Sequence, residues 1–230
     1  MDVIFDLYGT LMNIHTDEER DSFWSSFAKK MKKYKEYNKD ELRKEYLALC
    51  AEFQKDIEEI DILKVFEILF PAAPLDDIAV TFRKLSTDFI RPYVGVKKLL
   101  KTLKKDGHRI FLLSNAQASF TNYELDRFKL KPYFDGIFLS SDYGIKKPNI
   151  EYYKKLIEVY HIDINHAVMI GNDYKNDILP PKELGLKTIY IESNQSYFTD
   201  VEDKILNFGF KKVYERINSL VSWRVITLKE

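Results

Sequence analysis

The chain opens with Met1-Asp-Val-Ile-Phe-Asp-Leu-Tyr-Gly-Thr-Leu-Met-Asn-Ile14, and the rest of the fold can be worked out from this stretch. Residues 3–5 form a β-branched and aromatic run, which is typical of a buried strand. Asp6 closes that run and opens a turn that contains Gly9 and Thr10. In open α/β sheets, reactive groups lie just beyond the carboxyl ends of strands. We therefore expect Asp6 to stand at a strand end, with the Thr10 hydroxyl able to hold its carboxylate or an anionic ligand.

Composition limits the class of protein. The 230 residues are 45% hydrophobic, which supports a substantial core in one large domain or in a core with a smaller insert. Basic and acidic residues number 36 each, so the charge balance does not suggest nucleic acid or an anionic membrane as partner. No apolar run approaches the roughly 18 residues of a membrane span, and no secretion signal is recognisable. With one cysteine, Cys50, we expect a cytoplasmic protein; its oligomeric state cannot be read from the sequence.

Residues 14–90 have a helical period. Four apolar stripes predict roughly four helices with no strand between them, and we expect the aromatic residues to form the core of this unit. The stripes are Phe23, Phe27, Met31 and Tyr34; Leu42, Tyr46, Leu49 and Phe53; Leu63, Phe66 and Phe70; and Ile78, Phe82, Leu85 and Phe89.

After Pro92 the pattern alternates between helices and short apolar strands. Because strands separated by helices pair in parallel, the sequence predicts an α/β fold with a doubly wound parallel sheet. The predicted strands are residues 110–113, 137–139, 167–170 and 188–191, and the predicted helices are residues 96–103, 119–128, 152–160 and 182–184. The end of the chain predicts a loop or strand at 208–210, a helix at 213–220 and a strand at 223–228.

This pattern divides the chain into two parts. Residues 1–13 and 91–230 form the predicted α/β core, and residues 14–90 form an all-helical insert. A cleft between the two parts is the expected place for a substrate.

Polar residues follow the predicted strands at their carboxyl ends. Ser114 and Asn115 come directly after one strand, where a hydroxyl, an amide and free backbone N–H groups can cradle an anion. Lys147 lies in the loop after the next strand, and Pro148 disfavours helix at that position. We therefore expect the Lys147 ammonium to point into the cleft.

Two further acids, Asp173 and Asp177, follow the strand at 167–170. Together with Asp6 they would place three carboxylates near one another. A bound divalent cation usually offsets the repulsion among such carboxylates. Because no His or Cys accompanies them, the donor set favours Mg²⁺ over zinc.

In their order along the chain, these motifs resemble the haloacid dehalogenase (HAD) superfamily of hydrolases, with residues 14–90 similar to its helical cap. The resemblance implies that Asp6 is a nucleophile that forms a covalent aspartyl intermediate. It further implies a catalytic Lys147 and an anion site that comprises Thr10, Ser114 and Asn115. The implied cofactor is Mg²⁺, with Asp6, Tyr8, Asp173 and Asp177 as candidate ligands, and Tyr8 is also a candidate catalytic residue.

Tyr8 is where the chain departs from the phosphatases it resembles. Those enzymes usually carry an acid two residues after the nucleophile, and a phenol is a poorer base than a carboxylate at neutral pH. The 2-haloacid dehalogenases of the superfamily have tyrosine there, and Tyr153 also resembles a dehalogenase residue. Those dehalogenases work without metal, however, and lack the acidic pair Asp173 and Asp177.

We weigh the acidic pair more heavily and predict a Mg²⁺-dependent phosphatase of a small, anionic, phosphorylated metabolite. A metal-free 2-haloacid dehalogenase and a weakly active ligand-binding protein are the alternatives. Candidate substrate contacts near the hinges of the insert are His15, Thr16, Arg20 and Arg91.

Overall fold

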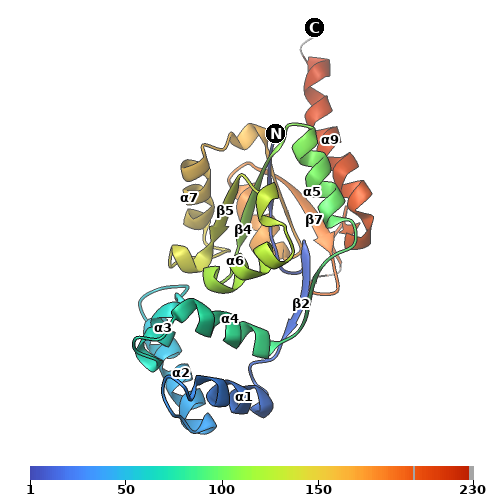
Figure 1. Cartoon of the computed structure of the whole chain (residues 1–230). Coiled ribbons are helices and arrows are strands. Elements are labelled where there is room, and N and C mark those ends of the chain that lie inside the picture. Colours follow the sequence, from blue (N-terminus) through green and yellow to red (C-terminus); the bar gives the residue numbers. More distant parts are fainter. Residues whose placement is uncertain (199, 228–230) are drawn as a thin grey trace.

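The computed structural model describes residues 1–198 and 200–227 (Figure 1). Within these residues, the main sheet has the strand order β5-β4-β1-β6-β7-β8, and its neighbouring strands are parallel. The doubly wound parallel sheet is confirmed, and β1 lies inside it. The strands are β1 (Asp2–Phe5), β4 (Arg109–Ser114), β5 (Gly136–Leu139), β6 (Ala167–Gly171), β7 (Lys187–Glu192) and β8 (Ile205–Leu206).

Alternation along β1 explains why both faces of the sheet are covered. Successive side chains of a strand point to opposite faces. Val3 and Phe5 belong to the apolar cluster formed with α5 (Val96–Lys105), α6 (Ala118–Arg127) and α9 (Phe210–Thr227). Ile4 belongs to a second cluster, which includes Tyr152 and Leu156 of α7 (Ile150–Tyr160). The strand that precedes Asp6 is therefore buried on both sides.

The four predicted helices of the insert are present. Their aromatic side chains form the core of this helical unit as expected, with Phe82 packed edge-on against Phe23 and Phe27 at centroid distances of 4.9 Å and 5.1 Å. Phe120 of α6 joins the same cluster, so the unit packs against the α/β part through this helix (Figure 1). The helices are α1 (Asp21–Met31), α2 (Lys39–Phe53), α3 (Ile62–Leu69) and α4 (Leu75–Ser86).

The prediction that the fourth helical stripe extends to Phe89 is wrong at its C-terminal end. α4 stops at Ser86, and Phe89 lies in β3 (Thr87–Pro92), which pairs antiparallel with β2 (Met12–Thr16). Both segments are rich in β-branched and aromatic residues, which suit a pleated ribbon. The predicted boundaries at residues 13 and 91 therefore fall inside the two strands that lead into and out of the helical unit.

The strand predicted at 223–228 is also wrong. Helix α9 continues to Thr227, and Leu228 lies outside the described residues. The helix predicted at 182–184 starts earlier, as α8 (Leu179–Glu183), after a short π-helical turn at Tyr174–Ile178.

In the part of the chain that is described, no helix has the length and apolar character needed to cross a membrane.

Candidate active site

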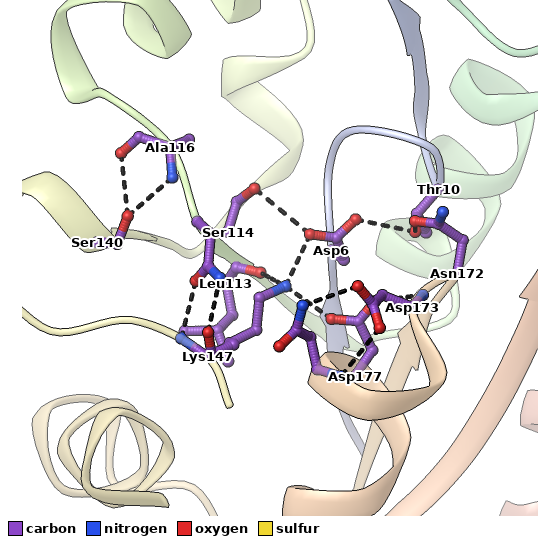
Figure 2. Close-up of polar contacts among 12 residues, drawn as sticks. Asp6, Thr10, Leu113, Ser114, Ala116, Ser140, Lys147, Asn172, Asp173 and Asp177 are labelled. Carbon is purple, nitrogen blue, oxygen red and sulfur yellow. Dashed lines mark hydrogen bonds and ion pairs between the residues drawn. The ribbon is translucent and has the colours of Figure 1, made fainter. Parts of the chain in front are cut away.

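Asp6 stands directly after β1, at the carboxyl end of the sheet (Figure 2), and only 6% of its surface is exposed. Its Oδ1 accepts a hydrogen bond from Lys147 Nζ at 2.8 Å and a longer one from Ser114 Oγ at 3.4 Å. Its Oδ2 accepts from Thr10 Oγ1 at 3.0 Å. The structure thus brings Asp6, Thr10, Ser114 and Lys147 together from three separate segments of the chain.

Gly9 allows the turn after Asp6 to close tightly. Its φ of +84° lies in the left-handed region, which side chains other than glycine rarely adopt. A Cβ at this position would also collide with the side chain of Asn172. Thr10 Oγ1 lies 3.0 Å from Asn172 Oδ1, so the close approach joins the Asp6 turn to the loop after β6.

Lys147 is the cation of the site and is 4% exposed. Its Nζ lies 2.8 Å from Asp6 Oδ1 and 2.7 Å from Asp177 Oδ1, and it also donates to the Leu113 carbonyl (Figure 2). Burial alone would lower the pKa of Lys147, but attraction by Asp177 and Asp6 outweighs burial and raises it. The ammonium is therefore charged and bridges the two acids.

Asn115 supports Lys147 from the backbone side. Its Nδ2 donates to the Lys147 carbonyl and its Oδ1 accepts from the Lys147 N–H, both at 2.8 Å. The side chain predicted to bind an anion is thus engaged in holding the lysine loop in place. Ser140 Oγ accepts from the N–H of Ala116 at 2.8 Å and so fixes the following turn (Figure 2).

Asp173 and Asp177 lie on the segment after β6, as expected. Asp177 is 1% exposed, and its Oδ2 accepts from the Asp173 N–H at 2.9 Å. Asp173 caps the start of the following turn, where its Oδ1 accepts from the N–H groups of Lys175 and Asn176. Burial raises the pKa of Asp177 to about 7, although the Lys147 ammonium acts in the opposite direction.

The fit of this site to Mg²⁺ depends on charge and donor atoms. Asp6 and Asp177 present two carboxylates to one ammonium, which leaves an excess of one negative charge when both are ionised. Asp173, Asn172 and Asn176 line the same cavity and supply further oxygen donors, the kind that Mg²⁺ prefers. Among residues 1–198 and 200–227, no three His, Cys, Asp or Glu side chains are already gathered to hold a metal ion. Donor chemistry and charge fit Mg²⁺, while Lys147 takes the position between two of the acids.

The Tyr8 hydroxyl makes its hydrogen bonds to α6 and not to Asp6. Its hydroxyl donates to Glu124 Oε2 and lies 3.0 Å from Thr121 Oγ1, both on α6. Burial and the negative charge of Glu124 raise the pKa of Tyr8 well above its ordinary value. We predicted the Tyr8 hydroxyl as a catalytic group and metal ligand. In the structure it is instead hydrogen-bonded to two residues of α6.

Three of the remaining sequence candidates, Tyr153, His15 and Arg20, have side-chain partners, while Thr16 and Arg91 lie in β2 and β3. The Tyr153 hydroxyl donates to the Asn176 carbonyl and so braces the acidic segment. His15 and Arg20 both pair with Asp88 of β3, which places them in the hinge between β3 and the helical unit.

The cavity beside Asp6 has a volume of about 460 Å³, and its lining includes residues that the sequence analysis missed. Asn194, Gln195 and Tyr197 follow β7 and form one wall, which is tied to β2 because Gln195 Nε2 donates to Asn13 Oδ1 at 3.0 Å. These polar residues follow a predicted strand, which is the same pattern that identified Ser114, Lys147 and Asp173 in the sequence. None of the described residues that line the cavity comes from α1 to α4; all belong to the α/β part.

Comparisons with known proteins identify the class. Residues 3–191 match the family described as haloacid dehalogenase-like hydrolase, so the chain belongs to this family. The described fold agrees: a HAD phosphatase from Thermococcus onnurineus superposes with a TM-score of 0.62 at 17% identity, covering 92% of this chain and 96% of that one.

Similar curated proteins are named phosphatases. Glyceraldehyde 3-phosphate phosphatase from Pyrococcus furiosus is 24% identical over 125 residues, which cover 54% of this chain and 52% of that protein. The protein of the same name from Methanocaldococcus jannaschii is 27% identical over 124 residues, covering 54% of each. The chain thus spans about half the length of these two relatives. Pyrophosphatase PpaX from Bacillus cereus is 25% identical over 191 residues, covering 81% of this chain and 80% of that protein.

Proposed function

We propose that this chain is a Mg²⁺-dependent phosphatase of a small phosphorylated metabolite, with Asp6 as the nucleophile. The observation that carries the proposal is the Asp6 carboxylate, which is held by Lys147 Nζ and by the Thr10 and Ser114 hydroxyls at the edge of an open cavity. Membership of the HAD-like hydrolase family and the phosphatase names of the relatives support it.

In the proposed reaction, the Asp6 carboxylate attacks the phosphorus of a phosphate monoester. The bond between phosphorus and the alcohol oxygen breaks, and an aspartyl phosphate forms. Water then attacks the phosphorus, which releases inorganic phosphate and restores the carboxylate. The Tyr8 hydroxyl donates its hydrogen bond to Glu124. We therefore infer that solvent or the substrate itself supplies the proton to the departing alcohol.

The remaining roles follow from position and charge. Lys147 and Ser114 hold the phosphoryl oxygens beside Asp6 and offset their charge. Asp6, Asp173 and Asp177 are the residues that would hold Mg²⁺. When bound, Mg²⁺ neutralises charge between the nucleophile and the phosphate dianion.

The charge of the cavity favours a phosphate monoester of an uncharged alcohol over pyrophosphate. Lys147 is the sole cationic side chain among the described residues that line the cavity, and it already bridges two acids. The wall formed by Asn194, Gln195 and Tyr197 is neutral. A second phosphate group would find no free cation there, and an unpaired charge in a partly dry cleft is costly.

We also propose that residues 14–90 act as a cap. The unit is joined to the α/β part through β2 and β3 and packs on α6, and none of its described residues lines the cavity. We place the protein in the cytoplasm, because one cysteine needs no oxidising compartment.

Tyr8 supports dehalogenation as a second candidate function. A departing halide needs no proton, so a site whose residue 8 offers no acid can still carry out that reaction.

The test measures phosphate release from a panel of sugar, polyol and carboxylic-acid phosphates and from pyrophosphate, with and without Mg²⁺. Chloride release from 2-chloropropionate is measured alongside. The proposal predicts Mg²⁺-dependent phosphate release that is highest on monoesters. Chloride release alone would support the second candidate, and silence in both assays would favour a ligand-binding protein.

A further inference from the structure

A second buried ionic group lies on the other side of the nucleophile loop. Arg83 of α4 donates from Nε to Glu124 Oε1 of α6 at 2.6 Å, and Glu124 Oε2 accepts from the Tyr8 hydroxyl. The side chains of Arg83 and Glu124 are 12% and 3% exposed. Three elements that are distant in sequence therefore meet at one carboxylate.

Ring contacts reinforce this connection. The Arg83 guanidinium lies over the rings of Tyr8 and Phe120, at 5.5 Å and 5.3 Å from their centroids. Phe120 in turn stacks on Phe82 of α4 at 5.9 Å. The end of α4 is thus held against α6 and against Tyr8 at the same point.

Apolar contacts would be enough to hold two helices together, and burying an ion pair is often no more stabilising than burying apolar residues of similar size. An ionic group of fixed geometry instead specifies one arrangement of its members. Here the arrangement includes Tyr8, which lies two residues after Asp6 and lines the same cavity. The turn after Tyr8 is closed by two backbone hydrogen bonds, from Gly9 N–H to the Met12 carbonyl and from Met12 N–H to the Leu7 carbonyl. Fixing Tyr8 therefore also restrains the rest of this turn.

We propose that Glu124 is a positioning residue. Together with Arg83 it fixes Tyr8, and it thereby links the docking of the helical unit to the shape of the loop that carries Asp6. Glu124 acts through Tyr8 and does not touch substrate. The kinetic part of this inference rests on the proposed phosphatase function, whereas the structural part does not.

The first experiment is hydrogen–deuterium exchange of the whole chain. Arg83→Met should speed exchange at residues 7–12 by about tenfold, because breaking a buried network lets this loop open more often. Glu19→Gln is the matched control, because Glu19 pairs with Arg43 on the exposed face of the helical unit, and residues 7–12 should exchange as in the wild type. If Arg83→Met does not fold, the double variant Arg83→Met/Glu124→Gln replaces it, since it leaves no unpaired buried charge. Unchanged exchange at residues 7–12 would overturn the proposal whatever the protein catalyses.

The second experiment is a double-mutant cycle on phosphate release. Tyr8→Phe and Arg83→Met should each lower kcat by about tenfold with KM within about twofold, because positioning within the loop is lost and substrate contacts are kept. The double variant should be no slower than the slower single variant. Independent effects, in which the two losses multiply, would contradict a shared network. Arg83→Lys should restore part of the rate, because it keeps the charge next to Glu124.

Discussion

Two buried ionic groups flank the nucleophile loop, and they differ in charge balance. In the Lys147 group, one ammonium faces Asp6 and Asp177, so one negative charge is in excess when both acids are ionised, and the group opens onto a cavity. In the Glu124 group, one carboxylate faces Arg83 and accepts from Tyr8, so charge and hydrogen bonds are matched. The unbalanced group is suited to take up a cation and a phosphate, whereas the balanced one is suited to hold a conformation.

The largest expected effect is the loss of the nucleophile. Asp6→Asn should lower phosphate release by at least about 1,000-fold, because the amide cannot form the aspartyl phosphate. Asp2→Asn is a matched control, since Asp2 is an equally buried acid at the other end of β1 that pairs with Arg109. Steady-state kinetics should show little loss of kcat in the control. An Asp6→Asn variant of near wild-type activity would remove the covalent step.

The next largest effect concerns the cation of the unbalanced group. Lys147→Met should lower kcat/KM by about 100- to 1,000-fold, as expected when a charged group that stabilises the transferring anion is lost. Its neighbour Lys146 lies 3.6 Å from Glu59 and is partly exposed, so Lys146→Met should change kcat/KM less than about threefold. Equal losses in the two variants would indicate a general effect of loop charge.

Stability should separate the balanced group from a surface ion pair. Arg83→Met leaves Glu124 buried without a counter-charge and should lower the free energy of unfolding by about 3–5 kcal/mol. Arg43→Met removes an exposed partner of Glu19 and should cost less than about 1 kcal/mol. Urea unfolding of both variants measures the difference. Similar losses would mean that the Glu124 group is no more than a surface contact.

A smaller effect of opposite sign is expected at Asp177. Because its pKa in the folded protein is raised to about 7 from an ordinary value near 3.8, ionised Asp177 costs stability, and this cost grows as pH rises from about 4 to 7. Without divalent cations, Asp177→Asn should therefore be more stable than the wild type at pH 8, by at least about 1 kcal/mol. The difference should vanish near pH 4. A variant that is less stable than the wild type at pH 8 would contradict the assignment of excess negative charge.

The members of the Lys147 group could be predicted from the sequence, whereas the ammonium bridge from Lys147 to Asp177 and the whole Glu124 group could not. Asp6, Lys147 and Asp177 each follow a strand and Ser114 ends one, and the carboxyl ends of parallel strands meet at one edge of the sheet. Glu124 lies within a helix among other polar residues, and its partners are 41 and 116 positions away. No local period distinguishes a buried carboxylate from an exposed one on such a helix, so only the packing of α4 on α6 reveals it.

The missed strands have a similar explanation. β2 and β3 are short and pair across an insert of four helices, and β3 begins at the residue after α4, where the helical stripe ends. At residues 223–227, β-branched and aromatic residues predicted a strand, whereas the backbone continues helix α9 to Thr227.

In the proposed reaction, Asp6 carries the phosphoryl group. This step can be observed by quenching the protein in acid during turnover of a phosphate monoester with Mg²⁺ and weighing the peptide that contains residues 1–14 by mass spectrometry. The peptide should carry the added mass of one phosphoryl group on Asp6, and this mass should be absent in Asp6→Asn and in the absence of Mg²⁺. Steady phosphate release without any phosphoryl group on this peptide would contradict this step.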